Sequence, residues 1–378
     1  MAEDGRLAGG IKRAKRFAAE FTDGLDSQAV RQLFDRDATQ AFRALADRRD
    51  DRPLPESLPE RFFCDVRDVF LGFVFKLSPA RRLLFTVSLL CPFFAAFDVD
   101  MQLGPTHIHL DFTPLWFLVG FLGMILLLAL ELVDRLRVRD ELEVARELQR
   151  DLLPRDVPPI PGYRVAHSYR TANEIGGDYY AFHPLDPGRV AIAGGDARGH
   201  GMAAGLLMAI ANATLAAAAL EDPQPEAVLA AVNRTLVSTG GRRAFMTLFY
   251  GILDPSSGQL EYANAGHPFP LLRRAVGPVE ELGTGALPLG LREDTRYRAA
   301  NAVLRPGDLL VLYSDGIPEA VDPSANAFGF DRLKRLAAQS GSADSIHDRV
   351  LEAVAAHVGD GDLHDDLTLV VLDRVSSV

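Results

Sequence analysis

The chain has 378 residues, of which 48% are hydrophobic and 24% are charged, and its formal net charge is −11. This length favours two or three folding units, and the composition excludes a chain that is disordered throughout. The acidic balance argues against broad nucleic-acid binding, which needs a basic face. The two cysteines, Cys64 and Cys91, form no CxxC pair, so neither a zinc site of that spacing nor a disulfide framework is expected.

The N-terminal region, residues 1–78, combines short amphipathic patches with the charged, Pro-rich break RRDDRPLPESLPE. It has no apolar core of the kind that a secretory signal peptide requires. No residue in it carries recognisable chemistry. We expect a cytoplasmic helical region whose role the sequence does not define.

Two apolar runs lie within residues 79–134. The second run, residues 112–133, is long enough to cross a bilayer, which takes about 20 residues, whereas the first run, residues 83–97, is shorter and contains Pro92. Arginines flank the outer ends of both runs, and the connector between them contains no Lys or Arg. The positive-inside rule then predicts a multi-pass transmembrane hairpin in the inner (cytoplasmic) membrane with both termini in the cytoplasm. A buried core helix is the alternative for the first run.

A linker helix is predicted over residues 135–158, ending near Pro154. The apolar positions at heptad-like spacing are Val138, Leu142, Ala145 and Leu152. Charged residues lie between them, and Gln149 interrupts the apolar stripe. Two interpretations stay open: the helix pairs with a second copy in a homodimer, or it packs on its own domain.

Strand-like and helix-like segments interleave from residue 159 to residue 378. The expected strands are 164–171, 178–185, 189–196, 245–254, 259–265, 308–315 and 367–373, and the expected helices are 202–220, 225–238, 330–340 and 343–358. The turn sequences DPG and DPSSG each separate two strands, as in hairpins. Because several strands follow one another without a helix between them, the pattern favours an α+β domain with antiparallel sheets over a doubly wound parallel sheet.

Four acidic residues lie at the ends of apolar strands or in the turns beside them. They are Asp178, Asp196, Asp315 and Asp365. A carboxylate in such a place is costly to desolvate unless something compensates its charge. Glycines flank three of the four, and glycine lets the backbone turn tightly or approach an ion closely. A single aspartate in a turn is commonplace, but four together predict a shared site for hard divalent cations such as Mg²⁺ or Mn²⁺.

Five motifs occur in order along this region: GGDYY, GDARGHGMAAGLLM, NAGHPFPLL, GDLLVLYSDGIPEA and DDLTLVVL. Together they resemble the motifs of PPM-type metal-dependent protein phosphatases, most closely the bacterial SpoIIE/RsbU-like branch. The resemblance covers about residues 140–374. It implies an α-β-β-α sandwich, in which two antiparallel sheets are flanked by helices, and a phosphatase domain over residues 159–378.

The resemblance also implies a two-metal site with Mn²⁺ or Mg²⁺. The implied metal ligands are Asp178, Asp196, Asp315, Asp365 and the backbone carbonyl of Ala197, and the four aspartates are the implied catalytic residues. The implied reaction is hydrolysis of phosphoserine or phosphothreonine by metal-activated water, without a covalent phosphoenzyme. In such relatives the substrate is typically a phosphorylated STAS-type anti-anti-sigma protein, and the same class is expected here. Asp366 should lie on the opposite face of its strand from Asp365 and ranks below it.

The sequence departs from the family pattern at two positions. Ala181 stands where an acidic residue often occurs, and His200 stands where many relatives have lysine. His200 and Arg198 are candidate phosphate contacts, with a solvent-exposed turn as the alternative. His267 is a candidate general acid, although a histidine in a Pro-flanked turn is more often structural.

Two other classes of function compete with the signalling phosphatase. A non-catalytic phosphoprotein-binding module with the same fold predicts a degraded set of acidic residues, and Ala181 is its only support. Another carboxylate–metal enzyme, such as a nucleotide cyclase or phosphodiesterase, predicts a base pocket and His-rich metal spacing. The sequence shows neither feature.

Overall fold

The computed structural model describes residues 58–94, 99–103, 106–110, 112–154, 156–172, 175–185, 188–199, 201–240, 244–359 and 361–375. Of the predicted N-terminal region, residues 1–78, the part from residue 1 to residue 57 lies outside the described residues. The chain divides into two compact units, residues 1–135 and residues 136–378. Each unit is described by itself.

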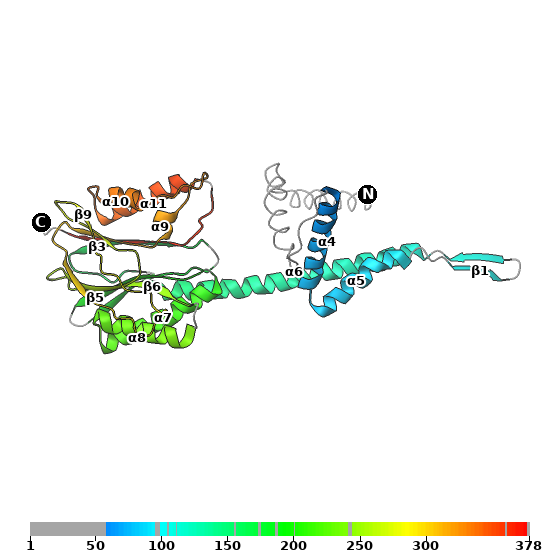
Figure 1. The fold of residues 1–378 in the computed structure, drawn as a ribbon, viewed down its shortest axis with the longest axis horizontal. Coiled ribbons are helices and arrows are strands. Elements are labelled where there is room, and N and C mark those ends of the chain that lie inside the picture. The colour runs from blue at the N-terminus through cyan, green and yellow to red at the C-terminus, as the bar shows by residue number, and fades with distance from the viewer. Residues whose placement is uncertain are drawn as a thin grey trace, which may run out of the picture. The chain divides into compact units, whose positions relative to one another are not determined.

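The first unit contains helices and one short β-hairpin (Figure 1). Its elements are α4 (Leu58–Lys76), α5 (Pro79–Phe94), β1 (Val99–Leu103), β2 (Thr106–Leu110) and the first part of α6 (Thr113–Leu152). Most of the first predicted apolar run forms α5, and the second run forms the first half of α6. The hairpin of β1 and β2 is antiparallel and lies in the predicted connector between the two runs.

Helices α5 and α6 pack closely where small residues meet. A β-carbon on Gly120 of α6 would lie 2.9 Å from the Ser88 carbonyl oxygen of α5, so this approach depends on the missing side chain. Contacts between small residues are typical of helix pairs in membranes. Arg81 also joins the two helices through ion pairs with Glu131 at 3.1 Å and Asp134 at 2.7 Å. The two apolar runs therefore form an antiparallel helix pair.

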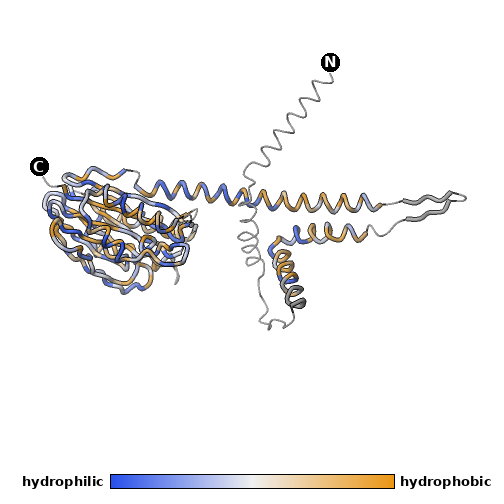
Figure 2. The backbone as a smooth tube through the Cα atoms, turned by 90° about the horizontal axis from the view of Figure 1, so that it is seen from above, coloured by the Kyte–Doolittle hydropathy of each residue, from blue (hydrophilic) through white to orange (hydrophobic). Residues whose placement is uncertain are grey.

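Helix α6 leaves large apolar side chains exposed, and Figure 2 shows it changing from apolar to polar along its length. Phe121 is 63% exposed and Leu128 is 70% exposed. Among the described helices, only α6 and Met202–Glu221 of the second unit are long and apolar enough to cross a membrane. The second of these helices packs in the core of its unit, which shows that a buried core helix and a membrane-spanning helix can have the same length and composition. Helix α5 has 16 residues, about 24 Å at 1.5 Å per residue, which is less than the roughly 30 Å hydrocarbon core. Membrane insertion remains a prediction.

The second unit is a four-layer α-β-β-α sandwich. One sheet has the strand order β10-β7-β6-β5-β4, formed by β4 (Asp178–Leu185), β5 (Arg189–Ala197), β6 (Met246–Leu253), β7 (Gln259–Ala265) and β10 (Ala300–Val303). The other has the order β3-β12-β11-β8-β9, formed by β3 (Tyr163–Arg170), β8 (Leu271–Arg273), β9 (Val279–Glu281), β11 (Leu309–Tyr313) and β12 (Leu367–Arg374). All of these pairings are antiparallel.

Helices cover the outer face of each sheet (Figure 1). They are α7 (Met202–Glu221) and α8 (Pro225–Gly240) on the first sheet, and α9 (Gly316–Glu319), α10 (Phe330–Ala337) and α11 (Ala343–Val358) on the second. Strand β5 has neighbours on both sides, helices over one face and the second sheet over the other. Residues 190–195 are therefore all buried, which explains why this segment is a continuous run of apolar residues and glycines.

The predicted fold class is confirmed, and the long predicted elements match the structure. Strands 178–185 and 259–265 and helix 343–358 have the expected bounds. The predicted helix 330–340 ends earlier, at Ala337. Strands β8, β9 and β10 and helix α9 were not predicted, because each has only three or four residues and too little length to show a period.

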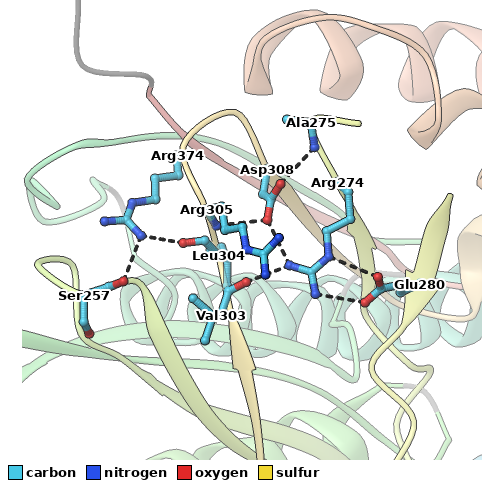
Figure 3. A network of polar contacts seen from close by, with 9 residues as sticks. All are labelled: Ser257, Arg274, Ala275, Glu280, Val303, Leu304, Arg305, Asp308 and Arg374. Atoms are coloured by element: carbon cyan, nitrogen blue, oxygen red, sulfur yellow. Dashed lines mark hydrogen bonds and ion pairs between the residues drawn. The ribbon is translucent and has the colours of Figure 1, made fainter. Parts of the chain in front are cut away.

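A polar network closes one end of the sandwich (Figure 3). Buried Asp308, just before β11, accepts hydrogen bonds from Arg274 Nη1 at 2.9 Å, from the Ala275 N–H at 2.8 Å and from the Arg305 N–H at 2.9 Å. Burial raises the pKa of Asp308, but these hydrogen bonds outweigh it and leave the pKa below its ordinary value. Arg274 also donates to the Val303 carbonyl at 2.7 Å, which links the second sheet to edge strand β10 of the first.

Candidate metal centre

Two of the predicted carboxylates face each other on neighbouring strands. Asp178 begins β4, Asp196 lies near the end of β5, and the two are direct partners in the antiparallel register. Like charges at such positions repel, because the β-carbons are only about 4.5–5.5 Å apart. Burial and the charge of Asp196 raise the pKa of Asp178 well above its ordinary value. Burial raises the pKa of Asp196 to about 8, with Asp315 as the next cause. A divalent cation between the two carboxylates would relieve this repulsion.

The backbone approaches closely beside this pair, where several oxygen atoms come together. A β-carbon on Gly177 would lie 2.6 Å from the Ala197 carbonyl oxygen, 2.9 Å from Asp196 Oδ1 and 3.3 Å from the Gly199 carbonyl oxygen. Only glycine leaves this point free. Carboxylate and carbonyl oxygens are the ligands that Mg²⁺ and Mn²⁺ prefer. The Ala197 carbonyl, a predicted ligand, belongs to this group of oxygens.

Asp315 and Asp365 come from the second sheet. Asp315 stands between β11 and α9, and burial, followed by the charges of Asp365 and Glu319, raises its pKa to about 6. Asp315 and Asp365 both help to raise the pKa of Asp196, so the carboxylates of the two sheets interact electrostatically. Asp365 is exposed and Asp366 is buried, and both precede β12, so their difference in burial comes from the turn before the strand and not from strand alternation. The Asp366 N–H donates to Asp365 Oδ1 at 2.8 Å.

The four carboxylates do not form a closed cage. Among the residues that the structure describes, no group of three or more His, Cys, Asp or Glu side chains is arranged to hold one metal ion. A cation at the Asp178–Asp196 pair would therefore complete its coordination with backbone carbonyls and water, as hard divalent ions commonly do. A donor set of carboxylates and carbonyls fits Mg²⁺ or Mn²⁺ better than zinc.

Further polar residues position these groups, and of these Thr368 and Ser314 were not candidates in the sequence. Thr368 Oγ1 of β12 donates to Asp178 Oδ2 at 2.6 Å, and the Thr368 N–H donates to Ser314 Oγ at 2.9 Å. Asp366 Oδ2 accepts the Gly177 N–H at 2.5 Å and so fixes the glycine loop. Asp366 lies directly before β12 and Thr368 within it, so both residues stand at the start of the strand that follows Asp365.

Thr247 of β6 lies beside the Asp178–Asp196 pair of β4 and β5. It is the register partner of Asp196, and its Oγ1 lies 3.0 Å from His267 Nδ1. His267 is buried, and burial lowers its pKa to about 3, so the imidazole is neutral near pH 7. Asn264 also holds the His267 backbone: the His267 N–H donates to Asn264 Oδ1 at 2.8 Å, and Asn264 Nδ2 donates to the His267 carbonyl at 3.0 Å. These contacts favour a structural role for His267 over that of a general acid.

The other sequence candidates differ in their placement. His200 lies outside the described residues. Arg198 is exposed, and its guanidinium carbon lies 4.9 Å from the centre of the Phe245 ring. Ala181 is buried in the core of the sandwich.

The linker helix ends against the glycine loop of this site. Gln149 near the end of α6 is 5% exposed, and its side chain donates to the Gly176 carbonyl at 2.5 Å and accepts the Gly176 N–H at 3.1 Å. Leu152 packs against the core of the same unit. Val144 and Leu148 are 58% and 64% exposed. The last turn of the linker thus packs on its own domain, while its neighbouring face stays open.

Comparisons with known proteins agree with this fold. The SiaA-PP2C domain of Pseudomonas aeruginosa superposes with a TM-score of 0.56 over 64% of this chain and 99% of that domain, at 21% identity. The chain is 25% identical to protein IcfG of Synechocystis over 66% of this chain, and 29% identical to phosphoserine phosphatase RsbU of Bacillus subtilis over 63% of it. It spans only 43% of the length of IcfG and 71% of that of RsbU. The second unit has the fold of a PP2C-type protein phosphatase domain.

A family model narrows this class further. The model described as stage II sporulation protein E (SpoIIE) matches residues 186–375, which is half of the chain. The chain therefore belongs to the SpoIIE family. Among the relatives, RsbU is named a phosphoserine phosphatase.

Proposed function

We propose that this chain is a membrane-anchored, metal-dependent serine/threonine protein phosphatase of a signalling pathway. The observation that carries the proposal is the direct opposition of Asp178 and Asp196 beside the carbonyl oxygen of Ala197. This arrangement concentrates negative charge and oxygen ligands where the buried pair needs a cation. Asp315 and Asp365 complete the proposed ligand set from the other sheet.

Two ions of Mn²⁺ or Mg²⁺ would supply positive charge for the phosphoryl oxygens and lower the pKa of the attacking water. The residues of the chain position the ligands. The Thr368 hydroxyl orients the Asp178 carboxylate and favours its ionised form. Asp366 accepts the Gly177 N–H and so fixes the glycine loop beside the Asp178–Asp196 pair. In this proposal, both sheets contribute ligands.

The proposed substrate is a phosphoserine- or phosphothreonine-bearing protein, of the STAS-type anti-anti-sigma class. The support is the membership of the SpoIIE family and the similarity to RsbU, which is named a phosphoserine phosphatase. Direct hydrolysis by water remains part of the proposal. It predicts that no phosphorylated Ser, Cys or Asp of the enzyme accumulates during turnover.

The proposed arrangement in the cell places residues 79–134 in the inner (cytoplasmic) membrane as a hairpin. Residues 1–78, the linker 135–158 and the phosphatase domain 159–378 would then face the cytoplasm. The apolar surface of α6, the small-residue contact with α5 and the flanking arginines support this arrangement.

We also propose that the linker helix pairs in a homodimer and acts on the metal site. Val144 and Leu148 are exposed on α6, one turn apart, and could pack against the same face of a second copy. Gln149 connects this helix to Gly176 in the glycine loop. Because Leu148 is exposed, Leu148→Lys should leave the fold intact but reduce dimerisation and activity of the membrane-inserted chain. An unchanged oligomeric state and activity would reject this part of the proposal.

The function is tested by dephosphorylation of a phosphoserine STAS-type protein by the full chain in detergent, with Mn²⁺ supplied. Turnover should disappear with chelator and in Asp196→Asn and Asp315→Asn. A folded, Mn²⁺-supplied chain without any phosphatase activity would instead favour the non-catalytic phosphoprotein-binding module. Folding of each variant is checked by circular dichroism.

A further inference from the structure

A pocket with mainly apolar walls opens beside the candidate metal centre. Its volume is about 370 Å³, at the lower end of the range of ligand sites, about 300–1,000 Å³. Asp315, a proposed metal ligand, lines it, as does Thr247, the register partner of Asp196. A phosphoserine bound at the metal centre would therefore place its neighbouring residues at the mouth of this pocket.

Aromatic side chains from separate parts of the chain form the apolar wall. Phe330, the first residue of α10, is 51% exposed, and its ring contacts the buried Tyr313 ring edge-on with centroids 6.4 Å apart. Phe269 lies on the loop before β8 and is half-buried. β-carbons on Gly283 and Gly285 would make ordinary van der Waals contact with its ring, at 3.6 Å and 3.4 Å, so this segment lies against the Phe269 ring. These rings give the pocket beside the candidate metal centre an apolar aromatic wall, and aromatic side chains contribute large contact areas at interfaces.

The charges at the edge of the pocket are paired with each other. Lys334 Nζ of α10 forms an ion pair with Glu281 of β9, and both residues line the pocket. This pairing leaves the Lys334 ammonium less available for a phosphate group. The phosphate of a substrate would therefore be attracted mainly to the cations bound at the metal centre. The aromatic wall is suited instead to an apolar side chain, whose burial contributes roughly 25 cal/mol for each Å² removed from water.

We propose that this pocket is a specificity site, in which Phe330 and Phe269 bind an apolar side chain of the substrate protein near its phosphoserine. The inference rests on the proposed phosphatase function and adds a substrate feature to it. An extended peptide advances about 3.3–3.6 Å per residue, so the bound side chain belongs to a residue within about three positions of the phosphoserine. The aromatic wall then favours substrates with leucine-like residues there and discriminates against substrates with glycine.

The test compares phosphoserine peptides that differ only in having Leu or Gly at one of the three positions on either side of the phosphoserine. The full chain in detergent micelles with Mn²⁺ is assayed, and p-nitrophenyl phosphate serves as a small substrate that has no peptide residues. For at least one position, kcat/KM of the Leu peptide should exceed that of the Gly peptide by about tenfold, within the range for an apolar group in a pocket. The ratio should fall to within about twofold in Phe330→Ser and be restored in Phe330→Leu.

The ratio is measured within each variant, so a loss of activity common to all substrates cancels. Val276, 92% exposed on the turn between β8 and β9, provides the matched control: Val276→Ser should keep the full ratio. The inference is overturned if the wild type hydrolyses Leu and Gly peptides at equal rates, or hydrolyses no peptide at all. It is also overturned if the preference for Leu persists in Phe330→Ser. Failure of the proposed function is distinguishable, because Mn²⁺-dependent hydrolysis of p-nitrophenyl phosphate would then also be absent.

Discussion

The hydrogen bond between Thr368 and Asp178 offers a sensitive test of the metal centre. Thr368→Val keeps the shape of the side chain but removes the 2.6 Å hydrogen bond from Oγ1 to Asp178 Oδ2. Asp178 is 1% exposed, so water does not replace the lost donor. Side-chain hydrogen bonds from Ser314 and Thr368 both lower the pKa of Asp178, so the loss of the Thr368 bond favours the protonated carboxyl, which cannot bind a cation.

The size of the effect follows from the charge on the acceptor. A hydrogen bond to a charged group contributes about 1.5–3 kcal/mol, and each 1.4 kcal/mol corresponds to a tenfold change in affinity. The Mn²⁺ concentration that half-saturates the site should therefore rise about 10- to 100-fold. Raising the pH should restore part of the affinity, because it ionises Asp178 again.

The assay is isothermal titration of the metal-free chain with Mn²⁺, so that it does not depend on turnover. Thr235→Val is the matched control: it removes a similar hydroxyl from α8, where Oγ1 donates to the Ala231 carbonyl at 3.2 Å. The control should bind Mn²⁺ as the wild type does. Wild-type Mn²⁺ affinity in folded Thr368→Val would refute a role for this hydrogen bond in the centre.

Three further predictions concern stability and the shape of the site. Gly177→Ala should abolish Mn²⁺ binding in titrations, because its β-carbon would lie 2.6 Å from the Ala197 carbonyl oxygen; retained binding would mean that the metal lies elsewhere. Asp308→Ala should lower the free energy of unfolding by about 2–4 kcal/mol in urea titrations, because two backbone N–H groups lose their acceptor, and an unchanged midpoint would contradict the network's role. Metal-free protein should lose stability as pH rises from about 5 to 8, because the raised pKa of Asp196 makes the folded state bind more protons than the unfolded state; the slope is about 1.4 kcal/mol per pH unit for each proton. Saturating Mn²⁺ should flatten that slope in thermal melts, and a flat profile without metal would be inconsistent with the buried pair.

Much of the fold was predictable because its strands are long and buried. The segment of β5 is an apolar and glycine-rich run flanked by turn residues, and it needs no partner to be recognised. The edge strands β8, β9 and β10 gave no such signal. Each has three or four residues, and its position depends on pairing with strands distant in the sequence.

The site was predictable in its carboxylates but not in the contacts between them. The opposition of Asp178 and Asp196 depends on the register that the β4–β5 turn sets, which a list of acidic residues does not contain. Thr368 and Asp178 are separated by 190 residues in the sequence and meet only when the two sheets pack. The interaction of Gln149 with Gly176 was hidden in the same way, because heptad spacing describes a helix and not its neighbours.

The most direct test of the central claim is a crystal structure of the second unit or the full chain with Mn²⁺, with anomalous diffraction recorded at the manganese edge. We expect two anomalous peaks, both within ligand distance of oxygens from Asp178, Asp196, Ala197, Asp315 or Asp365, and no peaks in Asp196→Asn. Anomalous density elsewhere, or none at this site in a Mn²⁺-activated enzyme, would contradict the proposed metal centre.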